Sequence, residues 1–288
     1  MSTFQLIPIS DQDFAVHHAV YCQENIWFHF DWQQRLDNFR TDGNGCLLLK
    51  DNIPIGGAAI TPDRITSPFL IPPFNSPVEF WQVLLPLCPR TGNRLLLQYI
   101  PASHEQTLML LSAEKIREKC MMARPTQTFS VTLNQSFFFT EPNEQDMDEI
   151  VEVIYQAHSH GYVSTVEGEI DCEEIARATA RRFAAFSQTG TLHWGSIVKK
   201  HSTGKIVAVC LTGIYPDSPN RFSTIHQVAV HPDYRRRGLA KSMMLRSISL
   251  AHESSPVITL GVLNGNPAKQ LYTSLGFQSG PAYSDYLL

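Results

Sequence analysis

The second half of the chain shows two hydrophobic periodicities in turn, one typical of helices and one typical of strands. Asn143 can cap a helix whose apolar positions 147, 150, 151 and 154 recur at helical spacing. Asp171, followed three residues later by Glu174, has the spacing of a capping box and predicts a second helix. The other predicted elements are strands at 137–139, 192–199, 205–214, 222–230, 257–263 and 283–288, and helices at 238–252 and 267–274.

The predicted elements follow the order strand, two helices, three strands, helix, strand, helix and strand, which indicates a mixed α/β sheet. The first half of the chain repeats this order with a weaker pattern, so we predict two copies of one topology. Its predicted elements are strands at 4–9, 46–50, 53–60 and 94–100, and helices at 11–25, 27–39, 78–87 and 104–111. The apolar pattern lapses near Pro125, within a polar stretch. We therefore expect two domains, 1–133 and 134–288.

Composition agrees with two globular domains and narrows the choice of partners. The 288 residues fit about two domains, and 43% hydrophobic residues can supply a core to each. A net charge of -4 gives no overall basic field, so we expect neither nucleic acid nor a membrane as a partner. No signal peptide is visible in residues 1–13, and no apolar run reaches the roughly 18 residues of a membrane span. We expect a cytoplasmic protein.

The cysteines stand singly along the chain, without the close pairs of a zinc ribbon or a redox dithiol. We therefore predict no metal site and interpret the cysteines as small buried side chains. They are Cys22, Cys46, Cys88, Cys120, Cys172 and Cys210.

Residues 228–240 combine the end of an apolar strand, a turn and the start of a helix. Free N–H groups and the positive end of the macrodipole make a helix N-terminus an anion site. Gly238 lets the backbone approach a ligand, and Ala240 keeps the entrance of the helix small. Mobile positive charge is expected from Arg235, Arg236, Arg237 and Lys241, with Leu239 inside the motif. The pattern predicts a pyrophosphate site, although a basic run on a surface turn is often only solvated.

The equivalent stretch in the first half of the chain lies near residues 72–75, with the sequence Pro-Pro-Phe-Asn. Prolines remove backbone N–H donors. We therefore expect no comparable anion site in the N-terminal copy.

Two motifs resemble those of one enzyme superfamily. Arg235-Arg-Arg-Gly-Leu-Ala240 after an apolar strand resembles the acetyl-CoA-binding motif of the GNAT superfamily of N-acetyltransferases, and residues 264–277 resemble its later Asn…Ala-x-x-Leu-Tyr-x-x-x-Gly-Phe signature. The resemblance covers about 136–288 and extends to the first half only in topology. It implies tandem GNAT-like domains in the α/β (α+β) class, each a mixed, mostly antiparallel twisted sheet flanked by helices. It also implies acetyl-CoA as cofactor and a degenerate N-terminal copy.

The resemblance also implies roles for individual residues of the site. It implies that the backbone of Val228, Ala229 and Val230 lies along the pantetheine arm, and that Val228 N–H stabilises the oxyanion. Tyr272 matches the family tyrosine near the thioester sulfur, where a neutral phenol can protonate the leaving thiolate. An aromatic residue simply packed on the sheet is the alternative. Either Asn264 or Asn266 is expected to meet the cofactor, because the spacing to Tyr272 is one residue shorter than usual.

A base for the amine proton is less clearly marked. Many family members have a glutamate on this strand where Thr224 stands here. His226 resembles the histidine at this strand position in serotonin N-acetyltransferases, and an imidazole of ordinary pKa suits the role directly or through water. His226 lies two residues before Val228 and would point to the same side of the strand if no bulge intervenes. The alternative is a polar strand residue bonded to a neighbour.

Other polar residues receive weaker interpretations. Glu167, Glu169 and Asp171 stand where the family places part of the acceptor site and could hold a cationic amine, but a solvated loop explains them equally well. His158 and His160 suit a helix end rather than a metal. His231 is expected in a turn, and Trp194 in the core of the sheet.

The leading interpretation is an acyltransferase that moves an acetyl group from acetyl-CoA to a primary amine of a small molecule or peptide, by direct attack in a ternary complex. A transferase of longer acyl or aminoacyl groups would use the same fold. A CoA-binding sensor or interaction protein without catalysis is the third candidate. The acceptor is bound by variable loops, so the motifs do not identify it. A homodimer is left open.

Overall fold

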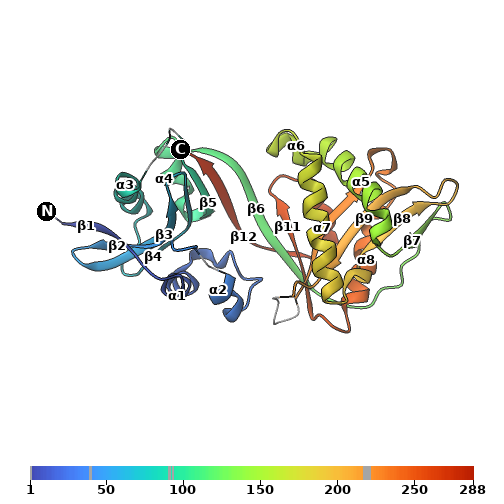
Figure 1. The fold of residues 1–288 in the computed structure, drawn as a ribbon, viewed down its shortest axis with the longest axis horizontal. Helices are drawn as coiled ribbons and strands as arrows, with labels where there is room; N and C mark the ends of the chain where they lie inside the picture. The colour runs from blue at the N-terminus through green and yellow to red at the C-terminus, as the bar shows by residue number, and fades with distance from the viewer. Residues whose placement is uncertain (1, 39–40, 90–91, 93, 217–221) are drawn as a thin grey trace. The chain divides into compact units, whose positions relative to one another are not determined.

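The computed structural model describes residues 2–38, 41–89, 92, 94–216 and 222–288. They form two compact units, each built of strands and helices (Figure 1). The first unit comprises Met1–Cys120 and Gly280–Leu288, and the second Met121–Ser279. Residues 121–133 therefore lie with the second unit and the C-terminal strand with the first, which differs from the expected division at 133/134.

The first unit is a mostly antiparallel sheet with strands in the order β1-β2-β3-β4-β5-β12. Strands β4 and β5 pair in parallel. The core lies around the fully buried Trp81, whose Nε1 donates to His104 Nδ1 at 2.9 Å. The elements are β1 (Phe4–Pro8), α1 (Asp11–Tyr21), α2 (Trp32–Asn38), β2 (Gly45–Lys50), β3 (Ile53–Thr61), β4 (Arg64–Leu70), α3 (Pro77–Leu87), β5 (Leu96–Pro101), α4 (Glu105–Leu110) and β6 (Glu114–Pro125).

The second unit has the strand order β6-β11-β10-β9-β8-β7. Here too one pair, β10 and β11, is parallel, whereas β7 to β10 are antiparallel. Strands β6 and β12 each begin in one unit and end in the other. The elements are β7 (Phe137–Thr140), α5 (Met147–Ser159), α6 (Tyr162–Glu167), α7 (Cys172–Gln188), β8 (Ser196–Lys200), β9 (Ile206–Gly213), β10 (Ser223–Val230), α8 (Leu239–Ala251), β11 (Val257–Leu263), α9 (Ala268–Ser274) and β12 (Gln278–Leu287).

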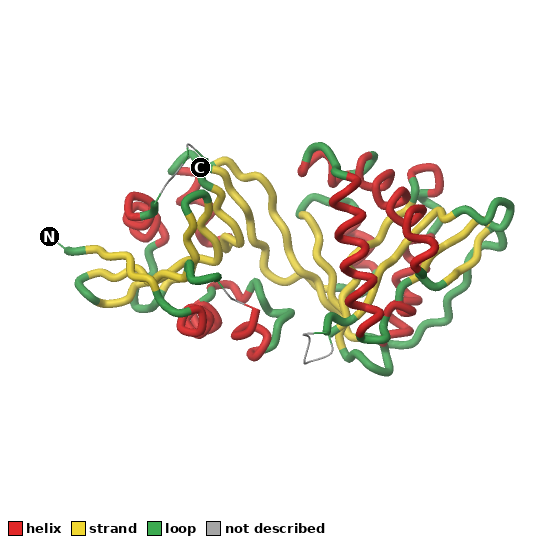
Figure 2. Tube along the Cα trace, in the orientation of Figure 1, coloured by secondary structure: helices red, strands yellow, loops and turns green. Residues whose placement is uncertain are grey.

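Strand β9 is buried along its whole length because helices cover both faces of this sheet (Figure 2). Val209 and Leu211 pack in one cluster with apolar residues of α5 and α7. Cys210 points to the other face, where its Sγ lies 3.6 Å from Ser247 Oγ of α8. The alternation of a strand thus separates the α5/α7 face from the α8 face. No helix among the described residues is both long and apolar enough to cross a bilayer.

The mixed α/β class and the repeated topology are confirmed, and most predicted elements lie within a few residues of their observed bounds. Several local predictions were wrong. Residues 192–194 form a 3-10 turn rather than the start of a strand. The helix predicted at 27–39 spans only Trp32–Asn38, and Phe39 lies outside the described residues. Asp171 caps α7 by accepting from Glu173 N–H at 2.8 Å, so it makes a simple cap and not the predicted capping box.

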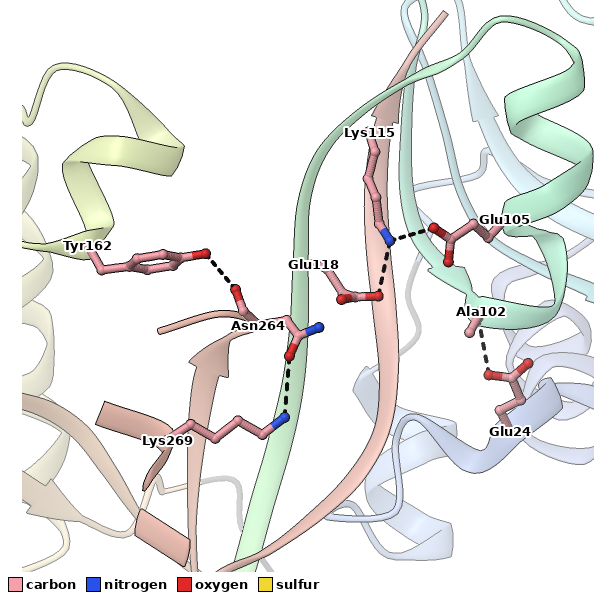
Figure 3. A network of polar contacts seen from close by, with 8 residues as sticks. All are labelled: Glu24, Ala102, Glu105, Lys115, Glu118, Tyr162, Asn264 and Lys269. Carbon is pink, nitrogen blue, oxygen red and sulfur yellow. Dashed lines mark hydrogen bonds and ion pairs between the residues drawn. The ribbon is translucent and has the colours of Figure 1, made fainter. Parts of the chain in front are cut away.

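Strands β4 and β6 were not predicted. β4 carries Pro68 and a β-bulge, and proline weakens the strand pattern of a sequence. β6 begins with alternating charges, a pattern typical of a solvated segment. In the folded protein these charges form ion pairs. Lys115 Nζ lies 2.8 Å from Glu105 and 3.1 Å from Glu118 (Figure 3), and Arg117 lies 2.7 Å from Asp285.

Candidate acyl-transfer site

Strands β10 and β11 separate partway along their length. The parallel pairing joins Ser223, Thr224 and Ile225 to the first half of β11. At the next residue a β-bulge interrupts the register between β10 and β9, with His226 as the extra residue. A bulge bends its strand, and it lies where the parallel ladder stops. The last four residues of β10 therefore keep their pairing with β9 while their other edge leaves the ladder with β11.

The free edge of β10 presents the N–H groups of Val228 and Val230. His231 N–H, one residue beyond the end of β10, donates to Val207 O of β9 at 3.0 Å. N–H directions alternate along an antiparallel strand, so Ala229 N–H also faces β9, and those of Val228 and Val230 face the opposite edge. Two of the three predicted backbone positions thus lie at the strand separation. Ala229 instead places its side chain in the α5/α7 core.

The loop from β10 ends on an uncapped helix. Pro232–Tyr234 form a 3-10 turn, in which His231 Nδ1 accepts from Asp233 N–H at 3.3 Å. Arg236 and Gly238 both have positive φ, of 63° and 77°. When a loop alternates between right-handed and left-handed backbone conformations, successive N–H groups converge, as in anion-binding nests. Gly238 is the N-cap of α8 and gives it no side-chain hydrogen bond, so the first turn of the helix is available to an anion.

The basic residues of this loop have different tasks. Arg235 donates to His160 O at 2.8 Å and to Ala157 O at 2.9 Å, so it caps the C-terminus of α5. Arg237 donates to Asp233 O and stacks on the Tyr234 ring, 5.3 Å from its centroid. The expectation of mobile positive charge is therefore wrong for Arg235, which holds the loop in place. Arg236 and Lys241 are exposed beside the start of α8.

The two candidate asparagines also divide their tasks. Asn266 Oδ1 accepts from Ala268 N–H at 2.9 Å and so caps the start of α9. Asn264 is exposed at the end of β11, and its Oδ1 lies 3.4 Å from Lys269 Nζ. Tyr162 of α6 donates its hydroxyl to Asn264 O at 2.8 Å (Figure 3). Gly265, with φ of 82°, has no room for a Cβ beneath this hydroxyl. The side chain of Asn264 is thus the better placed of the two for a ligand.

Tyr272 lies on α9, with its ring 6.4 Å from that of Phe277. Burial raises the pKa of its phenol to about 12, and Cys210 adds to the shift. Its hydroxyl makes no hydrogen bond to another described residue. The phenol therefore stays protonated at neutral pH and keeps its O–H as a donor.

His226 does not share a face with Val228, because the bulge intervenes. Ala229 faces α5 and α7, so Val228 faces α8, whereas His226 stacks against Phe186 of α7 at a centroid distance of 5.7 Å. Tyr215 lies edge-on to the same imidazole at 4.8 Å. Burial, together with Arg182, lowers the pKa of His226 to about 3. The imidazole is neutral, and its buried Nε2 has no hydrogen-bond partner among the described residues.

The remaining polar predictions have varied outcomes. Trp194 is buried, as predicted, although in the 3-10 turn before β8. The side chain of His158 hydrogen-bonds Gln227 Nε2 of β10 at 2.8 Å, and its pKa is lowered mainly by burial. The expected loop at 162–171 contains the short helix α6, which carries Glu167 at its end. Asp171 pairs with Arg177 at 3.4 Å.

Sequence reasoning missed Tyr162, Arg182 and Tyr215. Tyr162 lies in a stretch without clear periodicity. Arg182 follows another arginine on an amphipathic helix, which is typical of a solvated face. Only burial separates the two, since Arg181 is exposed and Arg182 is largely covered.

Comparison with known proteins agrees with this geometry. Residues 142–277 match the model of the acetyltransferase (GNAT) family. None of the curated proteins matches the sequence significantly.

Three solved structures illustrate the likeness of fold. A GCN5-related N-acetyltransferase from Sphaerobacter thermophilus is 16% identical, with a TM-score of 0.68 over 99% of this chain and 95% of the other. A tandem GNAT protein from the clavulanic acid biosynthesis pathway is 9% identical, with a TM-score of 0.59 over 99% and 98%. A GNAT-family acetyltransferase from Colwellia psychrerythraea is 10% identical, with a TM-score of 0.59 over 98% and 98%.

These likenesses extend over both halves of the chain, so the N-terminal unit is GNAT-like in structure as well. The separated parallel strands, the uncapped basic helix start and the match at 142–277 lead to one assignment. Residues 142–277 form a domain of the GNAT acetyltransferase family, and this domain follows an N-terminal domain of the same fold.

Proposed function

We propose that this protein transfers an acetyl group from acetyl-CoA to a primary amine of a small molecule or peptide. The observation that carries the proposal is the separation of β10 from β11 next to the uncapped N-terminus of α8. The N–H groups along the free edge of β10 can pair with an extended amide chain, as an added strand would. The helix start and Arg236 then suit a pyrophosphate.

The residues of the chain supply the remaining chemistry. Acetyl-CoA, when bound, brings an acetyl group activated as a thioester. Val228 N–H points into the strand separation and can stabilise the negative charge that develops on the carbonyl oxygen. Tyr272, held neutral by burial, can donate a proton to the departing thiolate.

The amine must lose a proton during direct attack, and His226 or a water beside it can accept that proton. The imidazole is in the required neutral form, with Nε2 available. Its low pKa makes it a weak base while the site is empty of other charges. We therefore assign His226 to a water-assisted role, and its substitution by glutamine should slow turnover less than loss of Tyr272.

Calorimetric titration with acetyl-CoA, and separately with CoA, tests the cofactor part of the proposal. Gly238→Asp places a carboxylate at the helix start and should weaken binding at least about 100-fold. Gly204→Asp is a matched control, because Gly204 also has positive φ and open space around it, but lies in the β8–β9 turn. Equal binding by the two variants would contradict the assignment of the loop.

Turnover separates an enzyme from a binding protein. Release of CoA thiol from acetyl-CoA, measured with a panel of primary amines, should depend on Tyr272. Binding of acetyl-CoA without turnover of any amine would favour a non-catalytic CoA-binding protein. Turnover only with longer acyl-CoA donors would favour the alternative transferase.

A further inference from the structure

A cluster of polar and aromatic side chains lies beside the bulge of β10, on the face covered by α7. Phe186 of α7, Tyr215 and His226 contact one another, with centroid distances of 4.8, 5.5 and 5.7 Å. Arg182 lies one turn before Phe186 on the helix and hydrogen-bonds Tyr215. His226 is the bulged residue at which the pairing of β10 with β11 ends, so the cluster lies next to the strand separation.

Arg182 has an unusual environment for a largely buried cation. Burial lowers the pKa of its guanidinium, and its other electrostatic neighbours are Tyr215 and Arg181. It forms no ion pair with a carboxylate of any described residue. Glu167 and Arg182 both act on the pKa of His158, which Glu167 raises and Arg182 lowers after the larger effect of burial. A guanidinium removed from water without an anionic partner destabilises the fold, unless a ligand completes the site.

Two more polar atoms in the region lack hydrogen-bond partners among the described residues. They are His226 Nε2 and Thr179 Oγ1, and both are buried. Thr179 lies one turn before Arg182 on α7, so the two share the face of the helix that packs on the sheet. Buried polar atoms are nearly always bonded to protein, water or ligand. These two unbonded polar atoms are an observation separate from the charge on Arg182, and they indicate a polar ligand.

We propose that Arg182 binds a carboxylate of the acceptor, and that the acceptor is therefore an amino carboxylic acid rather than a simple amine. That the carboxylate belongs to the acceptor rests on the proposed acyl transfer. The carboxylate-binding site itself is inferred from the geometry around Arg182. The planar guanidinium fork matches a carboxylate in two hydrogen bonds. The rings of Phe186 and Tyr215 provide apolar walls beside it.

A carboxylate fits the charge of this site better than a phosphate ester does. Arg182 offers one positive charge, and His226 beside it is neutral. One carboxylate balances that charge, whereas a phosphate ester brings about -1.5 to -2 at neutral pH. A bound carboxylate would also offset the influence of Arg182 that, after burial, lowers the pKa of His226. The acceptor would thus make the neighbouring imidazole a better base.

Binding to the CoA-saturated protein tests this assignment directly. The probes are the twenty standard L-amino acids, β-alanine and 4-aminobutyrate, each paired with its carboxamide, and binding is followed by calorimetry. We expect at least one acid to bind about 10- to 100-fold more tightly than its amide, as a charge-assisted bidentate pair predicts. Arg182→Gln should remove that preference, and Arg182→Lys should retain part of it.

Arg181→Gln is the matched control, because Arg181 is the preceding residue and is exposed. It should leave the preference for acids unchanged. Thermal unfolding provides a second readout, since Arg182→Gln relieves a buried charge and should not lower Tm. A merely structural Arg182, needed to hold Tyr215, would lower Tm and leave the acid-to-amide ratio as it was.

The outcomes separate this assignment from the proposed function. Acids that bind through Arg182 without being acetylated would support the carboxylate site and contradict the acyl transfer. Acetylation of amines or amides with the same KM in the wild type and Arg182→Gln would support the transfer and overturn the carboxylate site. If none of the acids binds, with or without CoA, the assignment of Arg182 is also overturned.

Discussion

The helices α8 and α3 occupy the same place in the order of elements of the two halves of the chain, but their first turns are capped differently. Each follows the fourth strand of its unit, and in each unit that strand is parallel to the fifth for three residue pairs. At α3, Ser76 accepts from Glu79 N–H at 3.2 Å and Pro77 occupies the first turn. At α8, Gly238 provides no side-chain cap and arginines precede it.

The charges of the two helix starts differ as well. Glu79 lies in the first turn of α3 and pairs with Lys50 at 2.8 Å, so a carboxylate of the protein already occupies the positive end of that helix. The comparison teaches that this fold provides strand separation in both copies. Under the proposed function, ligand binding depends on whether the helix start is left open.

The strand separations are also filled differently. In the first unit a bulge occurs near Ser67 of β4, at the position equivalent to His226. Tyr99 follows the last paired residue of β5, and its ring lies 5.0 Å from Trp27 and 5.6 Å from Tyr283. Aromatic side chains of the protein thus pack beside the separation in the N-terminal copy.

Removing the phenol of α9 should have the largest effect on catalysis. The helix after the fifth strand carries Tyr272 in the second unit, whereas its counterpart α4 has no tyrosine. Tyr272→Phe should lower kcat about 100-fold, the usual contribution of a general acid, and leave KM for acetyl-CoA nearly unchanged. Because the pKa of Tyr272 is about 12, kcat of the wild type should not fall between pH 8 and about 10 from its ionisation. An unchanged kcat in steady-state assays would show that Tyr272 only packs against the sheet.

Reversing the charge at the open helix start should give the next largest effect. Arg236→Glu makes α8 resemble α3, with a carboxylate near the first turn, and should weaken CoA binding about 10- to 30-fold. Lys205→Glu, at an exposed position in the β8–β9 turn, applies the same change of charge elsewhere. Calorimetry that finds equal losses in both variants would show a general field effect rather than a local site.

Removing the cap of α3 should affect stability but not cofactor binding. Ser76→Ala leaves Glu79 N–H without its acceptor and should lower the free energy of unfolding by about 1 kcal/mol. The affinity for CoA should stay within about twofold, because the N-terminal helix start is not part of the cofactor site. Denaturant unfolding and calorimetry on the same sample check both parts. Weaker CoA binding would indicate that the first unit contributes to the site.

The smallest expected effect concerns pH. The folded-state pKa of His226, about 3, lies below its ordinary value near 6.5, so folding favours the neutral form. The contribution of this lowered pKa to the free energy of unfolding is fully present above about pH 6.5 and is lost as pH falls toward 3. Between pH 7.5 and 6, His226→Gln should therefore lose about 0.8 kcal/mol less unfolding free energy than the wild type, in denaturant titrations. Equal losses would mean that the imidazole charges in an open, solvated site.

Much of the fold could be predicted from sequence because periodicity is a local property. The strand 257–263 and the helices α8 and α9 lie within one residue of their predicted bounds at each end. The strands β4 and β6 could not be predicted, since a bulged, proline-containing segment and a charged one become strands only when neighbours pair with them. The order of elements was nevertheless sufficient to recognise two copies of one topology.

In the candidate site, too, some features could be predicted from the sequence and others could not. The motif residues Arg236, Gly238 and Asn264 lie where the sequence indicated, at the open helix start and at the end of β11. Arg235 and Asn266 belong to the same motifs but are committed to the ends of α5 and α9. Spacing along the chain could not distinguish these cases, because their hydrogen-bond partners come from other turns and helices.

The sequence by itself determined the class of fold, the repeated topology and the position of the basic loop before α8, since these follow from local periodicity, turn residues and helix capping. Only the tertiary structure decided which polar groups remain available to a ligand. His226 and Arg182 show this most clearly. Their burial, their aromatic neighbours and the absence of a carboxylate beside Arg182 among the described residues arise from packing α7 onto β10. Desolvation depends on what surrounds a charge in space, and a linear pattern does not carry that information.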